Sequence, residues 1–585
     1  MDYRTQLQSI TLGGFKSIRQ THTLPISRLT LLFGPNSAGK SSLEEAIECL
    51  KRVFSESYKK GRTDTHESLL SRSIFGLLQD AWHRPTDRSD GQQLEMKLGV
   101  HYLLNWKTID GDNRLASGFI LEPDKLLDIE ITGNFDLWDR ESGESYAWPR
   151  LNNYLVEPRF DDSSDQCVTS QFIVTIDQVL LLDIKDAEYV RINLNHPRIK
   201  VRFDDAFNSF ITASVGKHGK LNDGFLHINM KGFFFLTPCF GISADSFIQS
   251  NELIDEHYDV LPHVPVRSIE TFLNQISSIF QTLVLLVNLD FQKISASRTI
   301  PTEDDLTIYT EGYFDESIFS NIINKKNSFP YEAIAYSIRH KVTGEAKHND
   351  DTLLDDINAI LSNHLFIEKG YRLSYDYAVL LSRNYIDNQL LDDQIFRHFT
   401  DDHPVFIKIF LADADNRKLR FNQVGSGISY VIPVAYALAR DRNAFIQQPE
   451  LHLHPALQAN LADAVLQSLY RMYTDGNYCG FDAVTPSVNF ENDSVSMISP
   501  PQLIIETHSE HLLLRLLKRI RQTSSGIPMD DEQKFTPDNL CILYFNPHLN
   551  GETSIHQIRV SAEGDFLDRW PHGFFPERDQ ELFDE

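Results

Sequence analysis

The chain has 585 residues, of which 41% are hydrophobic and 11% aromatic, so it is long enough for roughly two to four domain-sized units with a large core. Its formal charge of −27 argues against a general nucleic-acid coat protein, because phosphate contacts need local Lys and Arg. The five cysteines lack CxxC spacing, and the sequence shows neither an apolar signal region nor a run of the ~18 apolar residues that a membrane helix needs, so we expect a cytoplasmic protein.

The first predicted unit is a strand, a glycine loop and a helix. Residues 29–33 form a short apolar run, residues 34–41 read GPNSAGKS, and residues 42–50 place apolar side chains on one helical face. This order aims a helix N-terminus at an anion, and the loop has the complete P-loop spacing. The sequence therefore predicts ATP binding.

Each P-loop residue has a predicted part. Gly34 and Gly39 let backbone N–H groups approach phosphate, Lys40 can reach the β- and γ-phosphates, and the Ser41 hydroxyl can ligate Mg²⁺. The candidate nucleotide-binding residues of this loop are Gly34, Asn36, Ser37, Ala38, Gly39, Lys40, Ser41 and Ser42.

Two groups of basic residues are candidates for a local nucleic-acid groove, although the interpretation as solvated helix faces is favoured. The first follows the P-loop helix and the second lies late in the chain: Lys51, Arg52, Lys59, Lys60 and Arg62, then Arg515, Lys518, Arg519 and Arg521.

The predicted head is split by a long insertion. Residues 1–60 form its N-terminal half and 401–585 its C-terminal half, with a strand-rich subdomain at 61–260 and a mainly helical one at 261–400. Without sustained heptads, the insertion is expected to be compact rather than a long coiled coil. Strands are expected at 94–103, 171–176 and 201–203, and helices within 264–290 and 352–365.

Three polar segments of the C-terminal half follow or precede apolar elements. Gln447-Gln448-Pro449-Glu450 follows an apolar stretch, and His508 comes shortly after the apolar strand at 503–505. Val424-Gly-Ser-Gly-Ile-Ser429 precedes an apolar helix at 432–438, which makes a second anion-receptive helix N-terminus. Each segment alone is weak, and a turn or core histidine is the plainer interpretation of His508.

Together and in this order, these segments resemble the ABC-type ATPase heads of the SMC, RecF and OLD-like class, and in particular the AAA-family ATPases of prokaryotic anti-phage defence loci. The resemblance rests on the P-loop, Leu12–Ile18, Gln448–Gln458, Glu506–Leu516 and Trp570–Phe575, and Ala296–Pro301 is similar to a further landmark of that family. The fold class implied is α/β, a mixed-sheet ABC-type P-loop head interrupted by an α+β insertion.

The resemblance also implies how the motifs are used. Gly425, Ser426, Gly427 and Ser429 match the signature loop that completes the ATP site of a second subunit, residues 453–455 match the D-loop, and His508 matches the switch histidine. A homodimer, or a higher even-numbered oligomer, is therefore expected, with ATP and Mg²⁺ as cofactors. The class also has a Mg²⁺-sensing glutamine, which is expected within the strand-rich segment and is not placed by the sequence.

The chain departs from the class where acids usually hold magnesium and activate water. Gln447 stands at the metal position, so Ser41 and Gln447 are the predicted metal ligands, and Gln448, Glu450 and His508 are the predicted catalytic residues. Glu450 or Glu506 could replace the missing charge. Slow hydrolysis is expected, because a neutral amide compensates Mg²⁺ less than a carboxylate and cannot accept a proton as a base.

Several functions stay open. We expect an ATPase sensor that controls a separately encoded effector such as a nuclease; the alternatives are an ATP-bound scaffold that never hydrolyses and an ATPase that binds DNA ends in repair. Too few residues follow His508 for the nuclease domain of OLD-type relatives. Glu95 and Lys97 are better explained by an amphipathic strand than by a nuclease motif, and His452 and His454 lack a third metal ligand.

Overall fold

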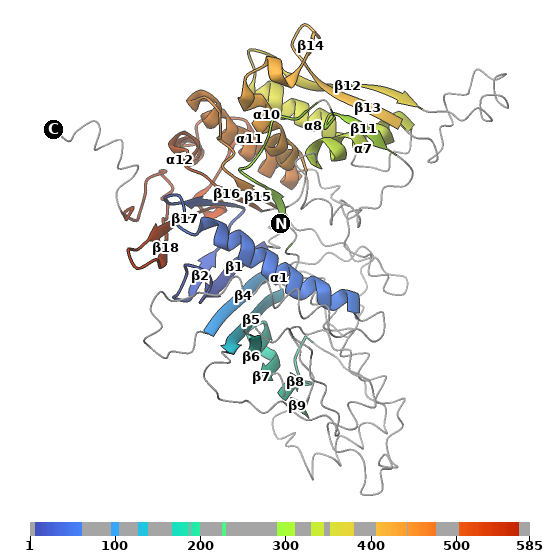
Figure 1. Ribbon diagram of the computed structural model, residues 1–585. Coiled ribbons are helices and arrows are strands. Elements are labelled where there is room, and N and C mark those ends of the chain that lie inside the picture. Colours follow the sequence, from blue (N-terminus) through green and yellow to red (C-terminus); the bar gives the residue numbers. More distant parts are fainter. Residues whose placement is uncertain are drawn as a thin grey trace, which may run out of the picture.

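The fold was analysed in a computed structural model (Figure 1). It describes residues 6–60, 95–104, 127–138, 166–185, 189–198, 225–229, 289, 291–302, 304–310, 329–343, 352–379, 405–440, 443–474 and 502–571. The helix expected within 264–290, the strand expected at 201–203 and part of the basic group around Arg62 lie outside these residues.

A six-stranded sheet forms the centre of the head. Its strands run in the order β10 (Gln292–Ile294), β15 (Ala444–Gln447), β16 (Leu503–Glu506), β3 (Leu29–Phe33), β17 (Leu540–Pro547) and β18 (Thr553–Gln557). All neighbouring pairs are parallel except the β17–β18 hairpin. Because β3 pairs directly with β16, segments from opposite ends of the chain form one sheet, which confirms the predicted split α/β head.

The parallel strands explain their apolar sequences. All five residues of β3 and all four of β16 are buried, as expected where helices cover both faces of a parallel sheet. The apolar strands predicted at 29–33 and 503–505 are confirmed by these two elements, and β15 contains the predicted apolar pair Phe445-Ile446. The P-loop, the Gln447–Glu450 turn and His508 therefore all follow the carboxyl ends of neighbouring strands.

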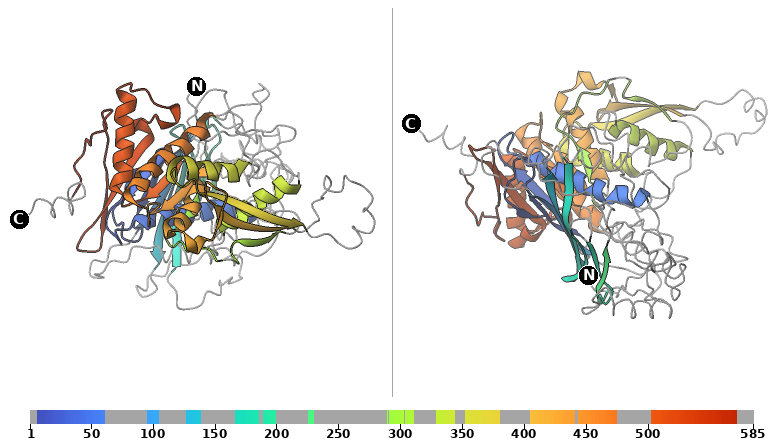
Figure 2. Two further views of the ribbon diagram at one scale, coloured as in Figure 1. Left: turned by 90° about the horizontal axis from the view of Figure 1, so that it is seen from above. Right: turned by 60° about the horizontal axis from the view of Figure 1, so that its bottom comes forward.

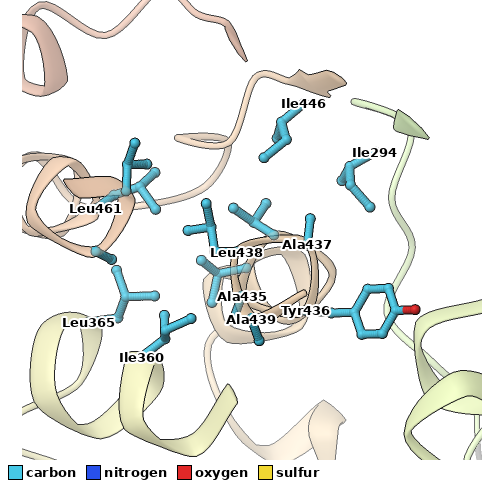
Figure 3. Packing of buried hydrophobic residues seen from close by; sticks show 14 of the residues in the cluster. Ile294, Ile360, Leu365, Ala435, Tyr436, Ala437, Leu438, Ala439, Ile446 and Leu461 are labelled. Atoms are coloured by element: carbon cyan, nitrogen blue, oxygen red, sulfur yellow. The ribbon is translucent and has the colours of Figure 1, made fainter. Parts of the chain in front are cut away.

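Four helices support this sheet: α1 (Lys40–Lys60), α10 (Ser426–Ala439), α11 (Pro455–Thr474) and α12 (Glu510–Ser524). Helix α10 is apolar on nearly every side, and such a helix is stable only when surrounded by other elements. Figure 3 shows Ile294 and Ile446 on one side of α10, Leu461 of α11 on another, and Ile360 and Leu365 on a third. This buried cluster connects the sheet to the insertion.

An eight-stranded antiparallel sheet forms the lower layer in Figure 1. Its order is β2 (His22–Pro25), β1 (Gln6–Gly13), β4 (Glu95–Leu104), β5 (Leu127–Trp138), β6 (Gln166–Ile176), β7 (Val179–Lys185), β8 (Tyr189–Asn193) and β9 (Phe225–Asn229). The strand-rich segment thus shares one sheet with the N-terminal residues. The strands predicted at 94–103 and 171–176 are confirmed by β4 and β6.

A buried amide links the two sheets. Gln502, just before β16, donates through Nε2 to Leu7 O at 2.9 Å and accepts from Leu7 N at 3.0 Å. Its side chain thereby pairs with both backbone groups of Leu7, a residue that β1 also aligns with Tyr102 of β4. The right-hand view of Figure 2 shows the strands of the antiparallel sheet, in blue to teal, running beside the blue helix α1.

A third layer contains a small sheet and two helices, seen at the top of Figure 1. Strands β11 (Thr307–Thr310), β13 (Val405–Ala412) and β12 (Arg372–Val379) pair antiparallel, with β14 (Lys418–Leu419) added to β13. Helices α7 (Phe329–Thr343) and α8 (Leu353–Ile360) pack nearby, and α8 continues as the π-helical turn η4 (Leu361–Leu365). The helix predicted at 352–365 is confirmed. The described residues also form three short 3₁₀ turns: η6 (Phe421–Gln423), η7 (Asp531–Gln533) and η8 (Pro537–Asn539).

Among the helices that the structure describes, none is long and apolar enough to cross a membrane.

Candidate nucleotide-binding site

The P-loop joins β3 to α1 and adopts a backbone that only glycine permits at two positions. Gly34 has φ +141°, and a Cβ there would lie 2.4 Å from Phe545 O. Gly39 has φ +85°, and its Cβ would lie 2.4 Å from Ser17 Oγ. Both contacts are far inside van der Waals distance, so the loop requires glycine at each position for steric reasons as well as for φ.

Lys40 is folded back over the loop. Its Nζ donates to Gly34 O at 2.9 Å and Pro35 O at 2.8 Å, and Glu506 Oε1 lies 3.7 Å away. Burial lowers the pKa of Lys40, and the neighbouring charges of Glu506 and Glu450 oppose that shift. The ammonium group of Lys40 thus lies at the mouth of the loop. There, phosphate oxygens can replace the two backbone carbonyls as its hydrogen-bond acceptors.

The predicted P-loop residues divide by exposure. Asn36, Ser37 and Ser41 are exposed, whereas Ala38 and Ser42 are buried. Ala38 O accepts from Thr553 Oγ1 at 3.1 Å, and Thr553 N donates to Ser17 O at 2.7 Å. The start of β18 and the turn before β2 therefore brace the loop from behind, leaving its exposed hydroxyls and N–H groups toward solvent.

Gln447, at the end of β15, is held at both ends of its side-chain amide. Its Nε2 donates to Glu44 Oε2 at 2.8 Å, and its Oε1 accepts from Ala296 N at 3.2 Å. These partners fix the orientation of the amide, because a backbone N–H can only donate and an ionised carboxylate can only accept. Glu44 lies on α1, one turn after Ser41, and also forms an ion pair with Lys293 of β10.

Gln448 is held through its backbone. It has φ +43°, a conformation that L-residues rarely adopt, and its N–H donates to Glu506 O at 2.7 Å. Arg298 donates to Gln447 O at 3.0 Å and to Gln448 O at 2.6 Å. The turn after β15 is therefore clamped from β16 on one side and from the segment after β10 on the other.

Arg298 is a site residue to which sequence reasoning gave no part, although the segment Ala296–Pro301 stood out as a landmark. It is only 8% exposed, and burial lowers its pKa to about 10, opposed by the charge of Glu450. The cost of burying this cation is offset by its two carbonyl acceptors and by that carboxylate. Arg298 therefore acts as a fastener of the β15 turn.

Glu450 joins the turn after β15 to the turn after β16. Its Oε2 accepts from Thr507 Oγ1 at 2.9 Å and its Oε1 accepts from His508 N at 2.7 Å. Burial raises the pKa of Glu450, while these hydrogen bonds and Arg298 oppose the shift. Since both carboxylate oxygens already accept hydrogen bonds, the observed part of Glu450 is to position the His508 backbone.

His508 projects an exposed ring beside the P-loop lysine. Desolvation, followed by the positive charge of Lys40, lowers the pKa of His508, so the imidazole is neutral near pH 7. The next residue, Ser509, caps α12 by accepting from Leu512 N at 3.0 Å, and its Oγ donates to Gln458 Oε1 at 2.7 Å. The ring is thus carried on a turn fixed on both sides.

The predicted signature loop opens helix α10. Gly425 is exposed, Ser426 and Gly427 are half-buried, and Ser429 is only 1% exposed. The Ser429 Oγ has no hydrogen-bond partner among the residues that the structure describes, so within one chain this hydroxyl faces the interior. A Cβ on Gly427 would lie 2.7 Å from His452 O, which places the loop directly against the predicted D-loop.

The oxygen donors near Ser41 fit a magnesium ion. The Ser41 hydroxyl and the Glu44 carboxylate lie one turn apart at the start of α1, and Mg²⁺ prefers oxygen ligands, whereas the Gln447 oxygen accepts from Ala296 N. Glu506 Oε2 is buried and has no hydrogen-bond partner within the described residues, as expected of an acceptor kept for a cation. When bound with ATP, such an ion neutralises phosphate charge.

The described residues hold no group of three or more His, Cys, Asp or Glu side chains that suits a metal ion. That agrees with Mg²⁺ chemistry, in which one or two carboxylates and the substrate phosphates supply the ligands. His452 instead lies against the ring of Tyr430, at 4.4 Å between centroids, and His454 O accepts the first backbone hydrogen bonds of α11.

The late basic group is largely committed to ion pairs. Arg515 and Arg519 both contact Asp463 of α11, at 2.9 Å and 2.8 Å, and Arg521 donates to Glu563 O. Asp463 is buried, so these arginines fasten α12 to α11. This geometry favours the structural interpretation of Arg515 and Arg519 over a nucleic-acid groove.

Comparisons with known proteins agree with this site. Residues 283–515 match the model of the family described as "AAA domain, putative AbiEii toxin, Type IV TA system". A search of curated proteins found no match. The matched range contains β10, α10, β15 and β16, and it ends within α12.

Solved structures of SMC heads are also similar. One SMC head bound to the C-winged helix domain of ScpA has 10% identity and a TM-score of 0.37, covering 94% of this chain and 98% of its own. The SMC head with an extended coiled coil from Pyrococcus furiosus has 11% identity and a TM-score of 0.33, and the match covers 95% of this chain and 97% of that one. The SMC head domain from Thermotoga maritima has 9% identity and a TM-score of 0.32, and the match covers 95% of this chain and 100% of that one.

The matched domain and the P-loop form one site, since β3 pairs with β16 and Lys40 faces Glu506. The P-loop therefore lies in the same sheet as the segment that matches the AAA domain, at residues 283–515, and together they form one P-loop nucleotide-binding head.

Proposed function

We propose that this chain is a cytoplasmic ATP-dependent regulator that closes into a head-to-head homodimer around ATP and controls a separately encoded effector in anti-phage defence. The observation that carries the proposal is the contrast at the sheet edge: a complete P-loop with Lys40 at its mouth stands beside a β15 turn that ends in neutral glutamines. Such a site binds nucleotide firmly and hydrolyses it slowly.

Dimer closure is supported by the surface at the start of α10. Gly425, Ser426 and Gly427 present backbone N–H groups at the N-terminus of a 14-residue helix, where a phosphate is favoured. Gly427 lies against His452, so the signature-like and D-loop-like segments form one continuous surface. Ser426, rather than the buried Ser429, is then the hydroxyl that reaches the ATP of the partner subunit.

Slow hydrolysis is supported by the lack of a free base in the turn. Gln448 orients water without accepting a proton, and Glu450 already receives two hydrogen bonds. In this proposal Ser41 and Gln447 lie at the magnesium ion, His508 donates to the γ-phosphate, and hydrolysis acts as a timer for the closed dimer.

The regulatory part comes from two sources. The sequence motifs resemble those of ATPases from anti-phage defence loci, and the matched family is described in terms of a toxin of a type IV toxin–antitoxin system. In this proposal the effector is a separately encoded protein, and a nuclease is the expected kind.

The experiment is a phage-plating assay with the complete native locus in a bacterial host. Protection is expected with the native chain and loss of protection with Lys40→Met, at equal protein levels. In parallel, light scattering of the purified protein is expected to show a dimer with ATP and a monomer with Lys40→Met. Full protection by Lys40→Met would reject the proposal.

A second candidate is an ATP-bound scaffold that never hydrolyses, and the two glutamines at 447 and 448 favour it. The two candidates are separated by identifying the nucleotide bound to the dimer, ATP or ADP, in samples taken over time. A regulator with a timer converts its bound ATP to ADP within the life of the dimer, whereas a scaffold releases ATP unchanged.

A further inference from the structure

We propose that Glu44, on α1, supplies the negative charge of the magnesium site that β15 lacks, and that Lys293 holds this carboxylate in place until the ion arrives. This inference rests on the proposed ATP-binding function. It assigns a metal-site residue outside every motif that identified the nucleotide site.

The first step is the position of Glu44. It lies three residues after Ser41 on the same helix, so both side chains lie on one side of α1, one turn apart. Ser41 is the P-loop hydroxyl that suits Mg²⁺. The Glu44 side chain is 11% exposed, and it points to the end of β15 because it accepts from Gln447 Nε2.

The second step is the orientation of Gln447. Its Oε1 is turned to the backbone N–H of Ala296, while its NH₂ group is turned to Glu44. An acid at residue 447 could not accept that arrangement, since it would place two carboxylates against each other. The amide of Gln447 on β15 is thus complementary to the carboxylate of Glu44 on α1. The strand supplies an amide where an acid is usual, and the helix supplies the negative charge.

The third step is the local balance of charge. Glu44 and Glu506 are close enough for their charges to repel, and Glu506 Oε2 remains buried without a hydrogen-bond partner in the described part of the chain. Two carboxylates and one unsatisfied oxygen beside a phosphate-binding loop form a site with unused capacity for a cation. Without a bound cation, Lys293 pairs with Glu44 and Lys40 pairs with Glu506.

The geometry gives Lys293 a distinct part. It is a half-exposed lysine on the edge strand β10, and its contact with Glu44 competes with any ion for the same carboxylate. Removing Glu44 and removing Lys293 should therefore change metal affinity in opposite directions. A merely structural ion pair would respond in the same direction to the loss of either partner.

The test measures Mn²⁺, a paramagnetic substitute for Mg²⁺, in the presence of a non-hydrolysable ATP analogue. The electron paramagnetic resonance signal of free Mn²⁺ reports the affinity of the full-length protein for the ion. The variants are Glu44→Gln, Lys293→Met and, as a matched control, Glu45→Gln, which changes the next residue of α1 and its separate pair with Lys16. Thermal midpoints confirm that each variant is folded.

We expect Glu44→Gln to weaken Mn²⁺ binding by about 10- to 100-fold, the usual range for a residue that sets a metal site. Lys293→Met should strengthen it a few-fold, and Glu45→Gln should leave it unchanged. Native Mn²⁺ affinity in Glu44→Gln overturns the inference, and so does equal weakening by Glu44→Gln and Lys293→Met.

A separate measurement distinguishes failure of the inference from failure of the proposed function. Binding of a fluorescent ATP analogue is measured in EDTA, where no divalent ion contributes. If the native chain binds no nucleotide under either condition, the proposed function and the inference both fail. If nucleotide binds but Glu44→Gln has the same Mn²⁺ affinity as the native chain, only the inference fails.

Discussion

The ends of β3 and β15, two strands of one sheet separated only by β16, are built differently. The end of β3 carries every residue that its phosphate-binding mechanics require, in eight consecutive positions. The end of β15 carries neutral amides, and the charges around it come from α1, β16 and the segment after β10. Affinity for nucleotide and speed of hydrolysis can therefore be set by separate parts of one site.

The largest expected effect is at the β3 end. Lys40→Met removes the ammonium that would bind the β- and γ-phosphates. Losing two charge-assisted hydrogen bonds costs about 3 kcal/mol, so ATP affinity should fall by about 100-fold. Isothermal titration calorimetry measures the change, with Lys534→Met, at an exposed lysine directly after η7, as the control. Unchanged affinity in Lys40→Met would mean that the loop does not bind phosphate.

The next effect is at the β15 end. Arg298→Met leaves the carbonyls of Gln447 and Gln448 without their donor and Glu450 without a nearby cation. The thermal midpoint should fall by an amount equivalent to about 2 kcal/mol. ATP affinity should stay within about threefold of native, because the P-loop is untouched. Arg298→Lys, which keeps the charge without the two-pronged geometry, should recover only part of the loss. A large loss of ATP affinity in Arg298→Met would break the separation of the two ends.

A third effect concerns the surface that would meet the partner subunit. Ser426→Arg places a long cation at the start of α10, so the ATP-dependent dimer should weaken by about 10-fold or more, as expected for a clash at a close-packed contact. Monomer binding of ATP should be unaffected. Analytical ultracentrifugation with and without ATP measures this, with Ser525→Arg at the far end of α12 as the control. Equal dimerisation of both variants would place the interface elsewhere.

The smallest effect is a pH dependence at His508. Its pKa is lowered by desolvation and by Lys40, so its stabilising contribution is present above about pH 6.5 and is lost as the pH falls through the lowered value. Bound phosphate raises that pKa again, so ATP binding should take up a proton and strengthen a few-fold toward low pH. His508→Asn should remove this part of the pH dependence. Identical profiles for both proteins would show that the ring does not face phosphate.

The elements read most directly from the sequence are those whose evidence is contiguous. The strand at 29–33, the P-loop and the start of α1 are adjacent, so apolar runs and glycine spacing predict them together. The same holds for α8, whose apolar residues recur at helical spacing. The predicted ABC-type head depended on resemblance, because β3 and β16 pair across more than 470 residues.

The partners of the β15 turn could not be predicted. Gln447 and Glu44 are 403 residues apart, and Arg298 reaches Gln448 across 150 residues. No local pattern links them, although an acid three residues after the P-loop serine was a usable signal for Glu44. The sequence also could not tell which signature-loop serine is accessible. Ser426 and Ser429 belong to the same motif, but only the structure shows that Ser429 is buried within α10.

The most direct measurement of the central claim is single-turnover ATP cleavage, with enzyme in excess over radiolabelled ATP and Mg²⁺ present. The account predicts that the native chain binds ATP and cleaves it far more slowly than the ~1 s⁻¹ of ordinary enzymes. It also predicts that a carboxylate base introduced by Gln448→Glu speeds cleavage without changing affinity. Native cleavage at about 1 s⁻¹ or faster would contradict it.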